Sequence, residues 1–420
     1  MAITEIRKHL TTLRTWVSVP DNSDFSIYNL PYGIFSVNDN VPRAGIAIGE
    51  QIVDLTAVAD LGLLDVNSTY FSQATLNDFI DLGKKITNKV RLDVQRLLVS
   101  ENSPLKNHTD VFVLQQDATM HLPVHVGDYT DFYSSIEHAA NVGKMFRDPE
   151  NALLPNWKHL PVGYHGRASS IVVSGTNIHR PMGQVKPNNK ELPTFKPSGN
   201  LDFELEMGFI IGKSTELGER ISTKNATDHI FGLVLFNDWS ARDIQKWEYV
   251  PLGPFLGKSF ASSMSPWIVT LEALEPFKVQ GPEQQPEVLP YLKYEGQHNY
   301  NIHLEVGMSS QTSDETIISV SNFKYMYWNM LQQLAHHTVN GCNVNVGDVM
   351  ASGTISGRNE RSFGSLLEIS WGGKKPFEMK DGSKRTFIED NDTVTMRGFA
   401  QIDEIRVGFG EVSGTILPSK

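Results

Sequence analysis

The chain has 420 residues, which is too many for one hydrophobic core, because single cores rarely grow beyond about 300 residues. Hydrophobic residues at 40% and charged residues at 20% are typical of a folded globular protein and exclude an acidic disordered one. The formal net charge of −11 argues against nucleic acid or an anionic membrane as the main partner. At roughly 150 residues per domain we expect about two or three domains.

Cysteine usage and the N-terminal sequence indicate the compartment. The single cysteine, Cys342, excludes an intramolecular disulfide and fits a reducing environment. Residues 1–16 lack the apolar stretch of a secretory signal, and no apolar run approaches the ~18 residues that span a bilayer. We therefore expect a cytoplasmic protein without a membrane partner.

The N-terminal part of the chain is predicted to form a small mixed unit. Short β-like pieces lie between residues 33 and 55, and apolar residues from Leu76 to Val99 recur at helical spacing. The polar stretch from Glu101 to Met120 contains Asn102-Ser-Pro and is interpreted as a linker. The first unit is thus expected to end near this stretch.

Beyond that stretch the pattern changes to many short β-like runs separated by turn residues. One run, Phe231 to Phe236, is apolar on both faces, which predicts a buried strand. Few helices are expected, and they cover residues 132–146, 223–230 and 322–337. The predicted fold class is α+β with β-strands dominant.

The segment from Leu201 to Met207 places three carboxylates on one face of a predicted strand. Alternate side chains point to the same side, so Asp202, Glu204 and Glu206 would follow one another at roughly 6.5–7 Å. Acidic residues are poor strand formers and like charges repel, which favours a divalent cation held between them. A solvated acidic face is the alternative, and the pattern does not choose between the two.

Two other polar clusters are candidate sites. Asn237 and Asp238 follow the buried strand directly, where a rigid strand end aims side chains into a site, although Asp238 could equally cap a following turn. A helix starting near Asp131 would bring that carboxylate and His138 to one side, two turns apart. A neutral histidine beside a metal-bound carboxylate can serve as a general base, whereas most histidines are surface or hydrogen-bonded core residues.

Several segments together resemble the fumarylacetoacetase family. They are residues 131–138, 154–170, 202–207, 237–259, 351–357 and 406–410, of which the block 237–259 is the most specific. The resemblance implies a small N-terminal SH3-like barrel domain over residues 1–118, a β-rich catalytic domain over residues 119–420, and a homodimer. It also implies hydrolysis of the carbon–carbon bond of 4-fumarylacetoacetate to fumarate and acetoacetate, the last step of tyrosine and phenylalanine breakdown.

The resemblance also implies roles for single residues. His138 would be the base that activates water and Glu368 its partner, while a Ca²⁺ or Mg²⁺ ion would bind the diketone and stabilise the enolate that leaves. The expected ligands of this ion are Asp131, Glu204, Glu206 and Asp238, with Lys258 and Ser262 beside a second cation. The residues expected to contact the substrate are Tyr133, Arg147, Tyr164, Gln245, Tyr249 and Thr354. Candidate donors to the oxyanion of the attacked carbonyl are Arg242, Gln245 and Lys258.

Two alternatives remain open at this level. The nearer is another metal-dependent member of the wider superfamily, such as an acylpyruvate hydrolase or an oxaloacetate decarboxylase. The N-terminal unit and the block 237–259 disfavour it, and turnover of the competing substrates would separate the two. The other is a calcium-dependent binding module, which would bind metal and ligand without His138 and cleave no bond.

Overall fold

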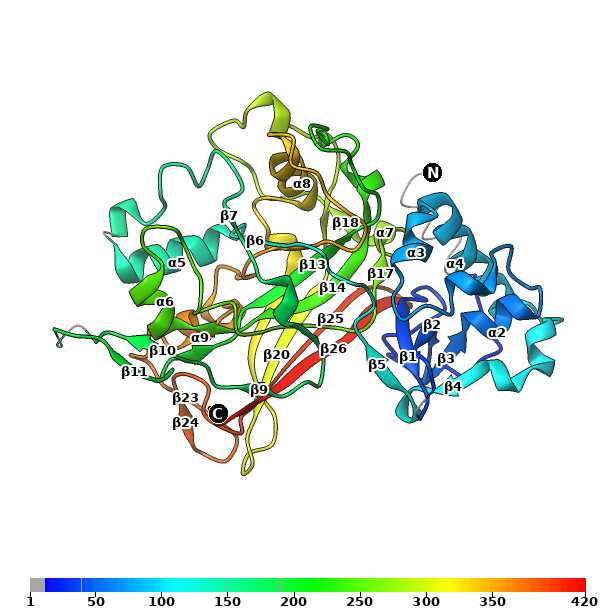
Figure 1. Cartoon of the computed structure of the whole chain (residues 1–420), viewed down its shortest axis with the longest axis horizontal. Coiled ribbons are helices and arrows are strands. Elements are labelled where there is room, and N and C mark those ends of the chain that lie inside the picture. Colours follow the sequence, from blue (N-terminus) through cyan, green and yellow to red (C-terminus); the bar gives the residue numbers. More distant parts are fainter. Residues whose placement is uncertain (1–11, 39, 148, 188, 190) are drawn as a thin grey trace.

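The computed structural model describes residues 12–420 except 39, 148, 188 and 190. Its N-terminal unit is a five-stranded antiparallel sheet in the order β4-β3-β2-β1-β5, flanked by helices (Figure 1). The strands are β1 (Tyr32–Ser36), β2 (Arg43–Ile48), β3 (Gln51–Asp54), β4 (Phe112–Leu114) and β5 (Thr119–His121), and the helices are α2 (Leu55–Asp60), α3 (Asn77–Asp81) and α4 (Lys84–Val99). Helix α4 buries Val90, Val94 and Leu98, which lie on one face at four-residue spacing.

Two predictions for this unit were wrong. The segment 101–120 is no linker, because β4 pairs with β3 and β5 pairs with β1 inside the sheet. The sheet therefore takes its last strand from beyond residue 118. The helix expected over 76–99 is two helices, since Gly83 between them adopts a φ of +89°, a conformation that glycine tolerates and a helix interior does not.

The larger part of the chain is built on an eight-stranded mixed sheet in the order β7-β6-β22-β13-β14-β16-β8, with β17 also paired to β14. Its strands are β6 (Tyr129–Phe132), β7 (Gly163–His165), β8 (Ile171–Val173), β13 (Leu205–Ile211), β14 (Ile230–Asp238), β16 (Ser262–Met264), β17 (Val269–Thr270) and β22 (Val349–Ala351). Every residue of β14 is buried, which confirms the buried strand predicted from its apolar sequence.

A second, five-stranded sheet in the order β21-β20-β25-β26-β9 packs against the first (Figure 1). Its strands are β9 (Ile178–His179), β20 (His303–Ser309), β21 (Thr316–Asn322), β25 (Thr393–Ile402) and β26 (Ile405–Leu417). Glycines permit the close approach: a Cβ on Gly398 of β25 would lie 3.1 Å from Leu235 of β14, and one on Gly414 of β26 would lie 2.8 Å from Trp239. The main core lies between these layers.

Short hairpins and helices complete this part. Paired short strands are β10 (Met182–Val185) with β11 (Thr194–Pro197), β12 (Leu201–Asp202) with β15 (Ser240–Ala241), β18 (Lys278–Val279) with β19 (Asn299–Tyr300), and β23 (Phe377–Glu378) with β24 (Lys384–Arg385). The helices are α5 (Ile136–Phe146), α6 (Arg242–Glu248), α7 (Leu271–Leu274), α8 (Met330–Thr338) and α9 (Leu366–Ile369).

The predicted helices of this part are shorter than expected. The first begins at Ile136 because the Ser135 side chain caps it, and the last begins at Met330 because Asn329 and Gln332 form a capping box. The segment 223–230 forms only a 3₁₀ turn, Ala226–His229. Capping residues outweighed the apolar spacing on which the predicted boundaries relied.

The two parts are joined by backbone pairing between Tyr32 and Ile268, with N···O distances of 3.0 and 2.8 Å. A small N-terminal unit and a large β-rich unit are both present, so the predicted α+β, strand-dominated fold class is confirmed. Among the described residues, no helix combines the length and the apolar character that crossing a membrane requires.

Candidate active site

Four buried carboxylates converge at one end of the central sheet. Asp131 lies on β6, Glu206 on β13 and Asp238 at the end of β14, while Glu204 directly precedes β13. One carboxylate oxygen of each residue lies within 4.8 Å of those of the other three. Strand pairing therefore brings together acidic residues that lie as far apart in the sequence as 131 and 238.

The segment 201–207 differs from the continuous strand expected there. β12 ends at Asp202, and Glu204 forms an isolated bridge with Ser365 before β13 begins. Asp202 consequently leaves the acidic face, and its carboxylate accepts hydrogen bonds from the amides of Leu366 and Leu367 at 2.7 and 3.0 Å. The prediction that all three acidic residues share one face of a strand was thus wrong. Glu204 and Glu206 are buried, which also rules out the solvated acidic face.

Two carboxylate oxygens of the cluster are buried without a hydrogen-bond partner among the described residues, Asp131 Oδ1 and Glu206 Oε1. The other oxygen of Glu206 accepts from the amide of Gly353 at 3.0 Å. Burial, reinforced by the neighbouring carboxylates, raises the pKa of Asp131 and of Glu206 well above the usual values. Unmatched buried oxygens fit a hard divalent cation, which takes oxygen ligands.

Two cationic side chains offset part of this charge. Lys258 Nζ donates to Glu204 Oε2 at 2.6 Å and to Asp238 Oδ2 at 2.5 Å, and Arg242 Nη2 pairs with Glu204 Oε1 at 2.7 Å. Burial would raise the pKa of Glu204, but Lys258 and Arg242 outweigh it and hold that pKa below its usual range. Because Arg242 also pairs with Asp202, two cations are shared among five carboxylates, and the surplus negative charge favours binding of a divalent ion.

The Asp238 carboxylate accepts hydrogen bonds from side chains of the site and not from the backbone of the following turn. Besides Lys258, it accepts from Tyr164 Oη at 2.9 Å and from Ser262 Oγ at 3.2 Å. The amides of Ala241 and Arg242, which Asp238 would cap, donate instead to the carbonyls of Gly257 and Asn200. The capping alternative for Asp238 was therefore wrong.

His138 and Glu368 form a buried pair, with 2.7 Å between His138 Nδ1 and Glu368 Oε2. His138 lies on α5, whereas Asp131 lies on β6, so the prediction that one helix carries both residues was wrong. The pair still lies beside the cluster, because Ser365, whose hydroxyl donates to Glu368, forms an isolated bridge with Glu204.

Glu368 accepts three further hydrogen bonds. Asn141 Nδ2 donates to Oε1 at 2.9 Å, and the hydroxyls of Ser356 and Ser365 donate to Oε2 at 2.8 and 3.0 Å. Burial would raise the pKa of Glu368, but His138, Asn141 and Ser356 lower it below its usual value. Glu368 is thus an ionised acceptor, which places the histidine proton on Nδ1 and leaves Nε2 as the basic nitrogen.

The residues expected to contact substrate lie at different depths. Tyr133 meets His138 edge-on with 5.2 Å between ring centroids, and buried Thr354 has a hydroxyl without a partner among the described residues. Gln245 accepts from Arg242 Nη1 at 3.2 Å. Tyr249 follows α6 and is half exposed.

Arg147, like Tyr249, is an exposed member of the set expected to contact substrate. It ends α5 and is exposed, and its guanidinium donates to the carbonyl of Ala152 at 2.8 Å. Burial raises the pKa of Tyr133, and the charge of Arg147 offsets part of that rise. Arg147 is thus near Tyr133 but committed to a local backbone contact in this structure.

Comparison with known proteins assigns the chain to a family. Residues 28–123 match the family described as fumarylacetoacetase N-terminal, and residues 129–416 match fumarylacetoacetate (FAA) hydrolase C-terminal. The chain is 52% identical over 414 residues to fumarylacetoacetase of Homo sapiens, covering 96% of this chain and 99% of that protein. Identity to fumarylacetoacetase of Dictyostelium discoideum is 52% over 424 residues, covering 98% and 99%. The chain belongs to the fumarylacetoacetase family.

Solved structures share the fold of this family member. A fumarylacetoacetate hydrolase from psychrophilic Exiguobacterium antarcticum aligns with a TM-score of 0.54 at 18% identity, covering 93% of this chain and 99% of that one. A maleylpyruvate hydrolase from Sphingobium sp. SYK-6 aligns with a TM-score of 0.50 at 13% identity, covering 93% and 100%. At these identities the likeness concerns the fold alone.

Sequence reasoning missed the polar residues that surround Glu368. Asn141, Ser356 and Ser365 are common residue types in stretches without an unusual pattern, and nothing in their spacing marks them. The nearest signal was the family motif 351–357, which contains Ser356. Their function follows only from the hydrogen bonds that the fold creates.

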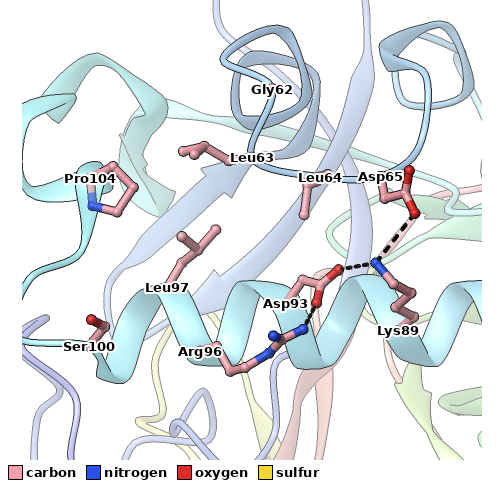
Figure 2. A pocket seen from close by; sticks show the side chains of 10 residues that line it. All are labelled: Gly62, Leu63, Leu64, Asp65, Lys89, Asp93, Arg96, Leu97, Ser100 and Pro104. Atoms are coloured by element: carbon pink, nitrogen blue, oxygen red, sulfur yellow. Dashed lines mark hydrogen bonds and ion pairs between the residues drawn. The ribbon is translucent and has the colours of Figure 1, made fainter.

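The N-terminal unit contains a cleft of about 520 Å³ between the loop after α2 and helix α4 (Figure 2). Its charged residues are paired with one another: Lys89 Nζ lies 2.8 Å from Asp93 and 3.7 Å from Asp65, and Arg96 also pairs with Asp93. The cleft is lined only by residues between 62 and 104, so it is separate from the carboxylate cluster.

Proposed function

We propose that this chain hydrolyses the carbon–carbon bond of 4-fumarylacetoacetate to fumarate and acetoacetate. The observation that carries the proposal is the buried His138–Glu368 pair beside four convergent carboxylates, in a chain 52% identical over 414 residues to human fumarylacetoacetase. Cleavage between two carbonyls needs an activated water, a polarised carbonyl and a sink for the departing carbanion. The site contains candidate groups for all three.

His138 is the proposed base. With Nδ1 hydrogen-bonded to Glu368, Nε2 accepts a proton from water, and the hydroxide adds to the carbonyl carbon of the fumaryl group. The carbon–carbon bond then breaks, and its electron pair leaves with the acetoacetate fragment as an enolate. The imidazolium returns its proton to that carbon, and Glu368 stabilises the imidazolium while it exists.

Asp131, Glu204, Glu206 and Asp238 are the proposed ligands of a Ca²⁺ or Mg²⁺ ion. Such an ion, when bound, supplies a Lewis acid that polarises the diketone and stabilises enolate charge. The unmatched oxygens of Asp131 and Glu206 support this assignment. Lys258 and Ser262, expected beside a second cation, already contact Asp238, and Lys258 neutralises charge in the cluster itself.

Arg242, Gln245 and Lys258 are the proposed donors to the oxyanion. Arg242 is fixed at three nitrogens, by Asp202, Glu204 and Gln245, so its guanidinium is held in one orientation. A donor that is already oriented stabilises developing charge without reorganising during the reaction.

Six residues are proposed to bind the substrate, and together they run from the buried base to the surface. They are Tyr133, Arg147, Tyr164, Gln245, Tyr249 and Thr354. The contact of Tyr133 with His138 and the exposure of Arg147, which could pair with a terminal substrate carboxylate, support this placement. The homodimer, the cytoplasmic location and the domain boundary near residue 118 stay predictions from the sequence.

The test is an assay of purified protein that follows loss of the diketone absorbance and identifies both products. We expect release of fumarate and acetoacetate that stops on chelation and returns with Mg²⁺ or Ca²⁺. Acylpyruvates serve as competing substrates in the same assay. Faster turnover of an acylpyruvate would move the proposal to that branch of the superfamily, and metal binding without any cleavage would contradict a hydrolase.

A further inference from the structure

Asp202 is a fully buried carboxylate that the proposed chemistry does not use. Its Oδ1 accepts from the amides of Phe203 and Leu366, at 2.8 and 2.7 Å. Its Oδ2 accepts from the amide of Leu367 at 3.0 Å and from Arg242 Nε at 2.8 Å. Four donors therefore converge on one side chain, and they come from three separate segments of the chain.

These segments carry both halves of the proposed site. Helix α9, which begins with Leu366 and Leu367, carries Glu368, the partner of His138. Arg242, which Asp202 holds through Nε, pairs through Nη2 with Glu204 of the carboxylate cluster. The backbone supports the same link, because Glu204 bridges Ser365. Asp202 is thus the side chain that contacts the segment of the base pair and the arginine of the cluster at once.

We propose that Asp202 is a positioning residue that holds Glu368 and Arg242 in fixed relation to each other and to Glu204. This inference rests on the proposed function, because it concerns the same site. Asp202 touches neither the proposed ion ligands directly nor, among the described hydrogen bonds, His138. It acts through the groups that it orients, in the way that outer carboxylates orient the ligands of metal sites.

The charge and symmetry of a carboxylate matter here. Asparagine has nearly the same shape, but one of its two terminal atoms is an NH₂ donor. In one orientation the NH₂ group of asparagine would face two donors, the Leu367 amide and Arg242 Nε. In the flipped orientation it would face the amides of Phe203 and Leu366. Either orientation leaves two buried donors unmatched, and one of them is always an amide of α9, so α9 and its Glu368 must move relative to residue 202.

Asp202→Asn is the test variant, and Asp392→Asn is its matched control. Asp392 is also buried and also accepts from an arginine Nε, that of Arg385 at 2.9 Å, and from a backbone amide, that of Glu389 at 2.9 Å. We expect Asp202→Asn to lower kcat by roughly 10–100-fold while KM changes by less than about threefold. Asp392→Asn is expected to keep kcat within about twofold of the wild type.

A double-mutant cycle with Glu368→Gln separates positioning from general destabilisation. If Asp202 acts through Glu368, removing it from the Glu368→Gln protein lowers kcat by a smaller factor than removing it from the wild type. Equal factors in both backgrounds would overturn the proposal. So would a folded Asp202→Asn protein with kcat within about twofold of the wild type, or equal losses in the Asp202 and Asp392 variants.

Two further measurements keep the result decisive. If Asp202→Asn does not fold, Asp202→Ser replaces it, since a hydroxyl keeps one acceptor without the charge. The changes in kcat and KM expected relative to the wild type are then the same. If the wild type does not cleave 4-fumarylacetoacetate, the proposed function fails, but the crystal structure of the variant still decides this inference. Displacement of the Glu368 carboxylate by about 1 Å, with or without movement of the Arg242 guanidinium, supports it, and an unchanged Glu368 position overturns it.

Discussion

His138 Nδ1 and Glu368 Oε2 lie 2.7 Å apart in the core, although 230 residues separate them in the sequence. Two serine hydroxyls and an asparagine amide hold the same carboxylate. The imidazole is therefore fixed in orientation and tautomer before any substrate binds, which is the arrangement that a histidine base requires.

Replacing His138 by alanine should remove the base. We expect kcat to fall by about 10²–10⁴-fold, because positioned proton transfer contributes that much, while divalent-ion affinity measured by calorimetry stays near the wild-type value. His179→Ala is the control, since that ring is exposed and bonds only to the carbonyl of Pro418 among the described contacts. Near-normal kcat in the His138 variant would mean that another group activates the water.

Glu368→Gln should change how stability depends on pH. The pKa of Glu368 is lowered from its ordinary value of 4.5, so the folded protein binds this proton less tightly than the unfolded chain does. The stabilisation is complete above pH 4.5 and is lost as pH falls through the lowered value.

Urea unfolding of both proteins measures this effect. The difference in free energy of unfolding between wild type and Glu368→Gln should be largest near pH 6 and should shrink toward pH 3. A difference that stays constant over this range would show that the lowered pKa of Glu368 does not contribute to stability.

Glu206→Gln should weaken divalent-ion binding. The amide keeps an acceptor but loses the charge of one of four clustered carboxylates, so we expect affinity for Mg²⁺ and Ca²⁺ to fall by roughly 10–100-fold. Glu411→Gln, on a half-exposed carboxylate that pairs with Arg397, is the control. Unchanged affinity in the Glu206 variant, measured calorimetrically after chelator treatment, would place the ion elsewhere.

Gly353→Ala should damage both the fold and the cluster. Gly353 has a φ of +78°, its amide donates to Glu206, and a Cβ would lie 2.2 Å from the carbonyl oxygen of Phe132. We expect the positive φ to cost about 1 kcal/mol and the clash to add about 1–3 kcal/mol.

Gly382→Ala measures the cost of the positive φ without a steric clash. Gly382 has a φ of +83°, but a Cβ there would meet nothing within 4 Å. It should therefore lose only about 1 kcal/mol and keep metal affinity. Thermal unfolding of the two variants checks the comparison, and equal losses of stability would refute the predicted clash at Gly353.

Some features of this protein were determined by local sequence. The apolar run 231–236 indicated a buried strand, and its polar continuation placed Asp238 at the strand end. The motifs around residues 131–138, 202–207 and 237–259 indicated the family, which the matches along the chain confirm. Periodicity and motifs suffice here because they depend on neighbours within a few residues.

Other features were decided only by the tertiary structure. The alternation of residues 201–207 predicted three acids on one face, yet Asp202 is drawn away by amides 164 and 165 residues further along the chain. The donors to Glu368 come from α5 and from the segment 356–365, and no local pattern links them. Hydrogen bonds between distant segments form only after the sheets have packed, so local periodicity contains no record of them.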